Sequence, residues 1–376
     1  MKCQAKSLDE VIQKAVRFVP RMTTMEALKY FEFSGTTVQA SSMHLGALLS
    51  LPEGLNFETR THVGAETFAS IAKKLSGEIT ITLTEKTMKI SDATSSFKLA
   101  LLSPEQFPTF PTCKAKYVKA PFVHPAVDAV KEFTMDPTNT RIETGVCLSD
   151  DVAVATDGKV LAIAKLGANT KFNDVLGPNV IGNFWNELDS EIATDGGLVF
   201  VKSKSGVIFG NTMEGKFINH TSFTNQWKFP VVASLKLEDL RKELPKIGII
   251  GKDKLNDITS AICTLQKKVL KMETTNSSGY VSVEIPVQCN GESKFRINVQ
   301  LLDKWMHKIH SEEAKMSCAS GIIGESGHPL SDTPIRFEGI TADDANDVSV
   351  FTAYIMPMTL DVGRGGQNES SDTRDP

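Results

Sequence analysis

The chain has 376 residues, of which 41% are hydrophobic and 23% charged. This size and composition fit two or three globular domains and exclude a disordered or collagen-like chain. The 41 Lys and Arg residues against 45 Asp and Glu residues give a net charge of −4, so any nucleic-acid binding must depend on a local basic patch. No apolar run reaches the roughly 18 residues of a membrane span, and the amino terminus has no apolar signal core. We therefore expect a cytoplasmic protein.

A helix followed by short strands is predicted at the start of the chain. Apolar residues recur at helical spacing over 8–16, and the S-x-x-E pattern from Ser7 to Glu10 is typical of a capping box. A second amphipathic helix is predicted over 65–75. It leads into an alternating strand over 78–84 and two further short strands over 88–99.

The same succession recurs twice further along the chain. Helices at about 125–133 and 237–244 open a second and a third unit. Helical spacing returns later in each unit, over 179–188 and 299–309, and strand-like stretches follow. Sequence self-similarity at a fixed period indicates repeated structural modules.

Three modules of this kind imply an α+β fold in which each antiparallel sheet is covered by two helices. We predict domains over 1–120, 121–232 and 233–360. The remaining residues, 361–376, lack apolar periodicity and are expected to form a disordered tail.

The sequence contains no strong enzymatic motif. Its six cysteines are scattered without a C-x-x-C pair, which argues against a zinc ribbon or a disulfide framework. His307 and His310 have i, i+3 spacing and could reach one metal, but no third ligand is evident nearby. Phosphate-loop, nucleophile-elbow and zincin motifs are absent from the sequence. We expect no catalytic residue, metal or cofactor, and a metal-dependent enzyme is the less favoured alternative.

Residues 152–163 read as two strands joined at Asp157 and Gly158, a dipeptide typical of tight hairpins. Asp157 could in principle be a catalytic carboxylate. No histidine or second carboxylate stands nearby to give it a defined role in acid-base chemistry.

This region carries a resemblance to a known family. Residues 140–147, followed by V-A-T-D-G-K-V-L-A over 154–162, resemble the centre of the bacterial DNA polymerase III beta subunit, the DNA sliding clamp. Residues 96–108 are similar to the segment that closes the first domain of that family. Residues 354–360, Y-I-M-P-M-T-L, are similar to its carboxyl-terminal segment. The matches lie in family order, and the resemblance covers about residues 1–360.

The matching segments also depart from the family pattern. Lys159 and Val160 stand where the family has histidine and arginine, and Thr359 stands where it has another arginine. The sequence is therefore identified as a divergent clamp, with partner peptides that could differ from those of the family.

The resemblance implies three similar clamp domains and a head-to-tail homodimer that closes into a ring around duplex DNA. It also implies a replication processivity factor that holds DNA independently of sequence. Its partners would be DNA polymerase, a clamp loader and repair proteins, which bind through short peptide motifs. The alternative is a clamp-fold scaffold that has lost DNA tethering.

The basic residues that would face DNA lie on predicted helices or match DNA-contacting positions of the family. For each one alone, a solvated helix face is the favoured interpretation. As a set they could form a positive lumen within an acidic protein. They are Lys14, Arg17, Arg21, Lys73, Lys74, Arg141, Arg241 and Lys242.

The resemblance implies two further surfaces. One is a Met-rich peptide pocket, a composition that suits several partners because thioethers repack easily. From spacing alone, the favoured interpretation of Met356 and Met358 is that they are core residues. The pocket positions are Thr156, Gly158, Lys159, Val160, Leu161, Ile218, Phe223, Tyr354, Ile355, Met356, Pro357, Met358 and Leu360. The other is the joint between subunits, where Phe97, Ile249 and Ile250 match apolar contacts of the family.

Overall fold

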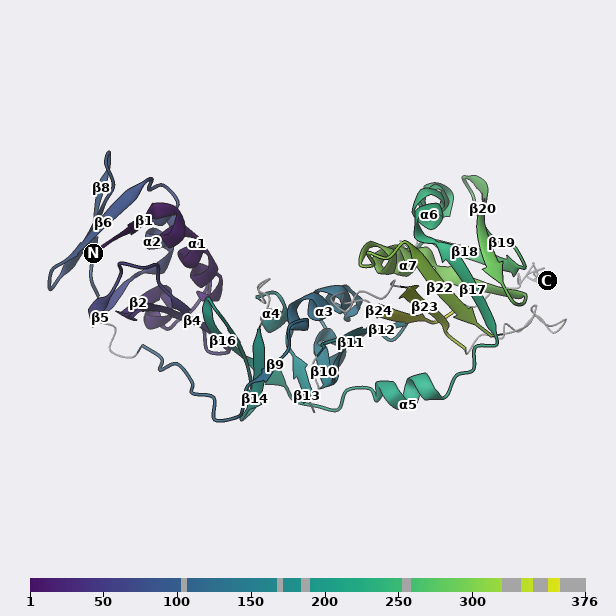
Figure 1. The fold of residues 1–376 in the computed structure, drawn as a ribbon, viewed down its shortest axis with the longest axis horizontal. Coiled ribbons are helices and arrows are strands. Elements are labelled where there is room, and N and C mark those ends of the chain that lie inside the picture. The colour runs from purple at the N-terminus through teal and green to yellow at the C-terminus, as the bar shows by residue number, and fades with distance from the viewer. Residues whose placement is uncertain are drawn as a thin grey trace, which may run out of the picture. The chain divides into compact units, whose positions relative to one another are not determined.

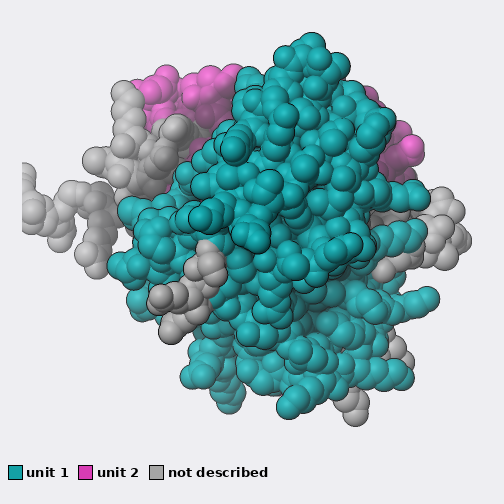
Figure 2. Space-filling model, turned by 90° about the vertical axis from the view of Figure 1, so that its left-hand side faces the viewer, with its two compact units in different colours: residues 1–154, 165–217 teal, residues 155–164, 218–376 magenta. Residues whose placement is uncertain are grey.

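The computed structural model describes residues 1–102, 107–167, 172–183, 190–251, 258–319, 333–340 and 351–358. The chain forms two compact units, coloured teal and magenta in Figure 2. Unit 1 contains residues 1–154 and 165–217, and unit 2 contains residues 155–164 and 218–376. Unit 2 therefore includes one short segment from the middle of the chain.

The first repeat has the order strand, helix, four strands, helix, three strands. Its elements are β1 (Lys2–Gln4), α1 (Ala5–Ala15), β2 (Tyr30–Gly35), β3 (Thr37–Ser41), β4 (Leu45–Ser50), β5 (Phe57–Gly64), α2 (Ala65–Ala72), β6 (Glu78–Leu83), β7 (Thr87–Ser91) and β8 (Ser96–Ala100). Two short 3-10 helices, η1 (Val16–Phe18) and η2 (Glu26–Lys29), lie between α1 and β2.

The second repeat has the same order. Its elements are β9 (Val118–Lys119), α3 (Val123–Val130), β10 (Val146–Asp150), β11 (Val152–Thr156), β12 (Val160–Lys165), β13 (Phe172–Leu176), α4 (Pro178–Ile181), β14 (Glu191–Asp195), β15 (Leu198–Ser203) and β16 (Gly206–Met213). Again two 3-10 helices, η3 (Lys131–Phe133) and η4 (Ile142–Thr144), lie between the first helix and the hairpin strands.

The third repeat follows α5 (His220–Asn225) and again has this order. Its elements are β17 (Val231–Lys236), α6 (Leu237–Gly251), β18 (Ser260–Gln266), β19 (Val269–Asn276), β20 (Gly279–Cys289), β21 (Ser293–Asn298), α7 (Val299–His307), β22 (Glu313–Cys318), β23 (Ile335–Ile340) and β24 (Phe351–Ile355). Figure 1 shows α6 and α7 next to each other. The predicted α+β class with three similar modules is confirmed, whereas the exact domain boundaries stay predictions.

Every strand pairing among the described residues is antiparallel, and two pairings join successive repeats. In unit 1, β4 of the first repeat pairs with β16 of the second, with Leu45 opposite Gly210. In unit 2, β12 of the second repeat pairs with β24 of the third, with Val160 opposite Ile355. In both cases the last strand of a hairpin joins the last strand of the following repeat.

Aromatic side chains pack against one another in the buried core of each unit. In unit 1, Phe33 stacks on Phe57 with ring centroids 4.8 Å apart and also contacts Phe68 of α2 at 5.1 Å. In unit 2, the fully buried Trp305 of α7 packs on Phe337 at 5.3 Å. Burying one such side chain contributes about 1.5–3 kcal/mol, so these contacts fasten the helices to the sheets.

The predicted capping box at Ser7 is wrong. Helix α1 begins at Ala5, and no side chain caps its start. The helix begins earlier because β1 leads directly into it, and the Ala5 N–H donates to the Gly77 carbonyl oxygen at 2.9 Å. A distant loop carbonyl thus satisfies one of the unpaired N–H groups of the first turn.

Some expectations fall outside the described residues. The apolar residues Phe184, Trp185 and Leu188, predicted to continue the helix that begins at α4, are among them, as is the predicted tail over 361–376. No helix in the described part of the chain is long and apolar enough to cross a membrane.

Candidate functional site

The turn between β11 and β12 is a closely hydrogen-bonded loop in unit 2. The Thr156 hydroxyl donates to the Val160 carbonyl oxygen at 2.6 Å and accepts from the Gly158 N–H at 3.1 Å. Asp157 Oδ1 accepts from the N–H groups of Lys159 at 2.7 Å and Val160 at 3.0 Å. Gly158 has a φ of 85°, which a residue with a Cβ rarely adopts. The predicted hairpin turn is confirmed, and Asp157 is one of its structural parts.

The turn is attached to the end of β24. The Met356 N–H donates to the Lys159 carbonyl oxygen at 2.8 Å, one step beyond the pair of Val160 and Ile355. The Met358 N–H then donates to the Arg296 carbonyl oxygen at 2.8 Å. These bonds hold the Met356 to Met358 segment against the sheet, where its side chains are half-buried.

Aromatic side chains lie beside this segment. Tyr354 is largely buried, and its ring meets Phe223 of α5 edge to face at 6.1 Å. The ring of Phe229 is 6.2 Å from that of Tyr354, and the guanidinium of Arg336 lies 4.9 Å from the Phe229 ring centre. Burial raises the pKa of Tyr354, against an opposing effect of the Arg336 side chain.

The structure thus brings together most of the predicted peptide-pocket residues. The turn residues Thr156 to Val160 and the segment from Tyr354 to Met358 meet directly, and Phe223 contacts Tyr354. Ile218 is 41% exposed in the segment before α5. Leu360 lies outside the described residues. Sequence analysis did not include Phe229 or Arg336, which pack on this site. The clustering of aromatic residues over 223–229 in the sequence is the signal that could have indicated Phe229.

Two of the predicted DNA-facing side chains on the first helix contact the second repeat within unit 1. Lys14 Nζ donates to the Ser205 hydroxyl at 3.1 Å. Arg17 Nη2, beyond the end of α1 in η1, donates to the Gly182 carbonyl oxygen at 2.6 Å. Both cations therefore help to connect the first two repeats as well as adding positive charge there.

The other predicted basic residues have different surroundings. Arg141 pairs with Glu143 at 3.1 Å. Arg241 of α6 donates to the carbonyl oxygen of Ile309, just beyond α7, at 2.7 Å, which neutralises the carboxyl end of that helix. The remaining four are exposed: Arg21, Lys73, Lys74 and Lys242.

The predicted joint residues lie beside strands with open edges. Phe97 is half-buried on β8, which among the described strands pairs only with β7. In unit 2, Ile249 is 79% exposed in the last turn of α6. Residues 279–286 of β20 pair with β19. The only other described partner of β20 is β17, which pairs with residues 287–289 of β20. Among the described strands, the second edge of residues 279–286 is therefore open. Tyr280, the second residue of β20, is 59% exposed.

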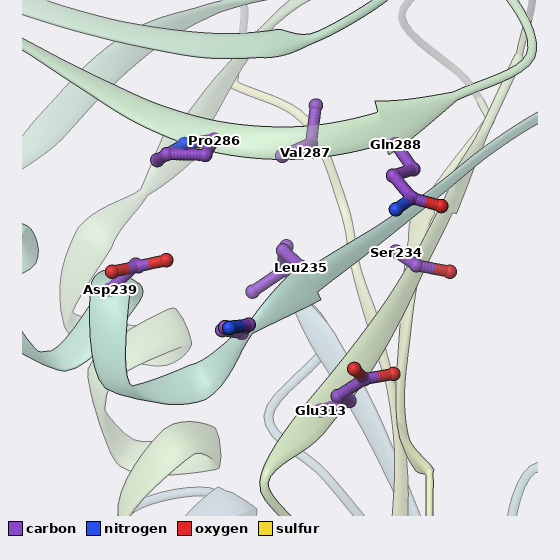
Figure 3. A pocket seen from close by; sticks show the side chains of 8 residues that line it. Ser234, Leu235, Asp239, Pro286, Val287, Gln288 and Glu313 are labelled. Atoms are coloured by element: carbon purple, nitrogen blue, oxygen red, sulfur yellow. The ribbon is translucent and has the colours of Figure 1, made fainter.

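Unit 2 also contains a cavity of about 480 Å³ between β17, the start of α6, β20 and β22 (Figure 3). Its wall carries the carboxylates of Asp239 and Glu313. No group of three or more His, Cys, Asp or Glu side chains that could hold a metal occurs in the part of the chain that the structure describes. The ring of His307 donates to the carbonyl oxygen of Asp303 on its own helix at 2.8 Å.

No family model matches the sequence, and no curated protein matches it either. Solved structures do match it along nearly its whole length. The DNA polymerase III beta subunit from Thermotoga maritima has a TM-score of 0.77 at 16% identity, covering 96% of this chain and 99% of that one. The DNA polymerase sliding clamp from Bacillus subtilis has a TM-score of 0.79 at 15% identity, with coverages of 96% and 98%.

The chain has the fold of a bacterial DNA sliding clamp. A third match, the Helicobacter pylori beta clamp bound to a DNA ligase peptide, has a TM-score of 0.77 at 15% identity and covers 96% of this chain and 100% of that one. The clamp fold accounts for the threefold repetition of elements.

Proposed function

We propose that this chain is a DNA sliding clamp, a non-catalytic processivity factor that encircles duplex DNA as a homodimer. The observation that carries the proposal is the match of 96% of the chain to clamps along their full length. The motifs around Asp157 and Met356, quoted from the sequence, support it independently, because the fold brings both into one site.

The way in which successive repeats join supports the proposed dimer. Strand β4 pairs with β16, and β12 pairs with β24, so each repeat offers its hairpin strand to the last strand of the next. Two strands in equivalent positions have no described partner in a neighbouring repeat. They are β20, the hairpin strand of the third repeat, and β8, the last strand of the first. Pairing of β20 with β8 of a second copy would continue the pattern, and doing so twice closes a ring. Ile249 and Phe97 would lie at that joint.

Contact with DNA is proposed for the exposed cations. Arg21, Lys73, Lys74 and Lys242 are available for phosphate, and Arg141 would exchange its pairing with Glu143 for a phosphate. Lys14, Arg17 and Arg241 already donate to protein oxygens and would act mainly through their charge. Phosphate contacts of this kind hold DNA without reading its sequence, which is what sliding requires.

Partner proteins are proposed to bind at the surface formed by the turn at Gly158 and the segment from Met356 to Met358. A DNA ligase peptide is bound to the Helicobacter pylori clamp, and here an apolar segment lies half-buried beside aromatic side chains. The proposed partners are DNA polymerase, a clamp loader and repair proteins that carry short apolar peptides.

A topological experiment tests this function. The protein is diluted until the dimer dissociates, mixed with nicked circular DNA and concentrated so that rings close around the DNA. A sliding clamp should co-elute with the circle in high salt and be released when a restriction enzyme linearises it. Equal retention on circular and linear DNA would contradict the proposal. A stable dimer that is retained on neither would favour a clamp-fold scaffold.

A further inference from the structure

Unit 1 has an apolar hollow of about 600 Å³ at its surface, separate from the peptide site described above. Leu28 of η2, which is buried, lies at this hollow. Met22 and Met43 also line it, and they are 93% and 69% exposed. Single exposed apolar side chains are ordinary, whereas exposed apolar side chains that form one contiguous patch mark interaction surfaces.

The hollow occupies, in the first repeat, the place that the proposed peptide site occupies in the second. It is formed by the loop between η1 and η2 and by the turn from Ser42 to His44 between β3 and β4. The turn from Asp157 to Lys159 stands at the same point in the second repeat, between β11 and β12. Both turns therefore follow the same succession of helix, two 3-10 helices and two hairpin strands.

The backbone bonding of the two turns is the same. The His44 carbonyl oxygen accepts from the Asn211 N–H at 2.9 Å, and the Lys159 carbonyl oxygen accepts from the Met356 N–H at 2.8 Å. Leu45, the first residue of β4, pairs with Gly210, and the donor Asn211 follows Gly210. Val160, the first residue of β12, pairs with Ile355, and the donor Met356 follows Ile355. The same backbone frame is thus present twice, with different side chains.

The side chains indicate the chemistry of the occupant. None of the residues that line the hollow is Asp, Glu, Lys or Arg, so its wall suits an uncharged apolar side chain. Arg21, in the same loop as Met22, is exposed and has no hydrogen-bond or ion-pair partner among the described residues. Its guanidinium is assigned above to a DNA phosphate, and in the absence of DNA it would pair with a carboxylate next to the apolar anchor instead. The chain's own last sixteen residues do not supply such an anchor, since Val362 is their one large aliphatic side chain.

We propose that unit 1 carries a second docking site, which takes a short extended peptide with large apolar side chains next to an acidic residue. The proposal rests on the proposed function, because it assigns to the first repeat the kind of partner proposed for the second. Flexible thioethers adapt to different anchors, which suits a site that serves several peptides.

Methionine-methyl NMR of the full chain tests this site directly. The probe is the acetylated pentapeptide Gly-Asp-Leu-Phe-Gly, with Gly-Asp-Ala-Ala-Gly as its control, and signals are assigned by single Met→Leu substitutions. We expect Gly-Asp-Leu-Phe-Gly to shift the Met22 and Met43 signals in a saturable way. The variant Met43→Asp should abolish the shift at Met22 and leave the shifts at Met356 and Met358 unchanged. Met25→Asp, in the same loop but outside the hollow, should preserve all of them.

The outcomes separate this inference from the proposed function. Saturable shifts at Met22 and Met43, with the Met22 shift lost in Met43→Asp, support the second site, whether or not Met356 responds. Shifts at Met356 alone overturn the second site and leave the proposed peptide surface standing. Shifts at neither place overturn both. A duplex oligonucleotide that shifts Met22 when the peptide does not would identify the hollow as a DNA contact and also overturn the proposal.

Discussion

The backbone N–H of Met356 donates a hydrogen bond of 2.8 Å to the carbonyl oxygen of Lys159. This bond joins a segment near the carboxyl end of the chain to a turn in its middle. The turn itself depends on Asp157, whose Oδ1 accepts from two backbone N–H groups. The Asp157 carboxylate therefore helps to set the shape of the proposed peptide surface without needing to touch the peptide.

Replacing Asp157 with alanine should weaken peptide binding without abolishing folding. The two N–H groups of Lys159 and Val160 would lose their acceptor, at a cost of about 1 kcal/mol for each bond. A turn loosened in this way should reduce peptide affinity severalfold, measured by fluorescence anisotropy with a labelled clamp-binding peptide. The control is Asp151→Ala, in the exposed turn before β11. Equal affinities of the two variants would contradict the role of Asp157.

Replacing Ile249 with arginine should yield monomers. Ile249 is 79% exposed beside the open edge of β20, and a charge buried in an apolar joint without a partner is strongly unfavourable. Sedimentation velocity should show a doubled mass for the unaltered chain and the mass of one chain for the variant. Ile218→Arg, which changes another exposed isoleucine of unit 2, should remain dimeric. A dimer that survives Ile249→Arg would remove this residue from the joint.

Replacing Arg21, Lys74 and Arg141 together with alanine should shorten retention on circular DNA while the dimer stays intact. Each lost phosphate contact should reduce the slope of log affinity against log salt by about 0.9. The matched control changes three exposed lysines in hairpin turns of the sheets, Lys86, Lys267 and Lys268. If the control variant loses retention to the same extent, net charge rather than these positions holds the DNA.

Asp92 should make the first repeat sensitive to acid. Hydrogen bonds from the Thr94 N–H, the Ser95 hydroxyl and the Ser76 N–H hold the pKa of this carboxyl well below its usual value. A folded-state pKa below the unfolded one gives stability that is present above about pH 4 and is lost as the pH falls toward the folded pKa.

The replacement Asp92→Asn should therefore lower the stability of the first repeat at neutral pH. The difference from the unaltered chain should shrink as the pH is lowered from about 4. Urea unfolding at several pH values measures it. A difference that stays constant with pH would show that charge on Asp92 is unimportant.

The parts of the fold that local sequence patterns specify were predictable. The periodicity around Leu8 and Phe68 indicated helices, and Asp157 with Gly158 indicated the hairpin turn that the structure contains. Because these signals recur along the chain, the threefold repetition could be inferred as well. The hydrogen bond from Ala5 to Gly77, which replaces the expected serine cap, involves a partner far along the chain.

Side-chain partners that are distant in sequence were not predictable. Arg17 was expected to face DNA, yet it donates to Gly182 in the following repeat. Phe229 and Arg336 join the peptide surface only because unit 2 brings them to Tyr354. Local periodicity states which face of an element is apolar, but it does not state which distant residue that face meets.

The pairing of β12 with β24 has a consequence for biosynthesis. Residues 160–164 of β12 pair with residues 351–355 of β24, so the ribosome makes the two partners at very different times. Most of unit 1 can be complete on the nascent chain while β12 still waits for its β24 partner. A translation product that stops before residue 351 would keep the turn at Gly158 and lack the strand that holds it.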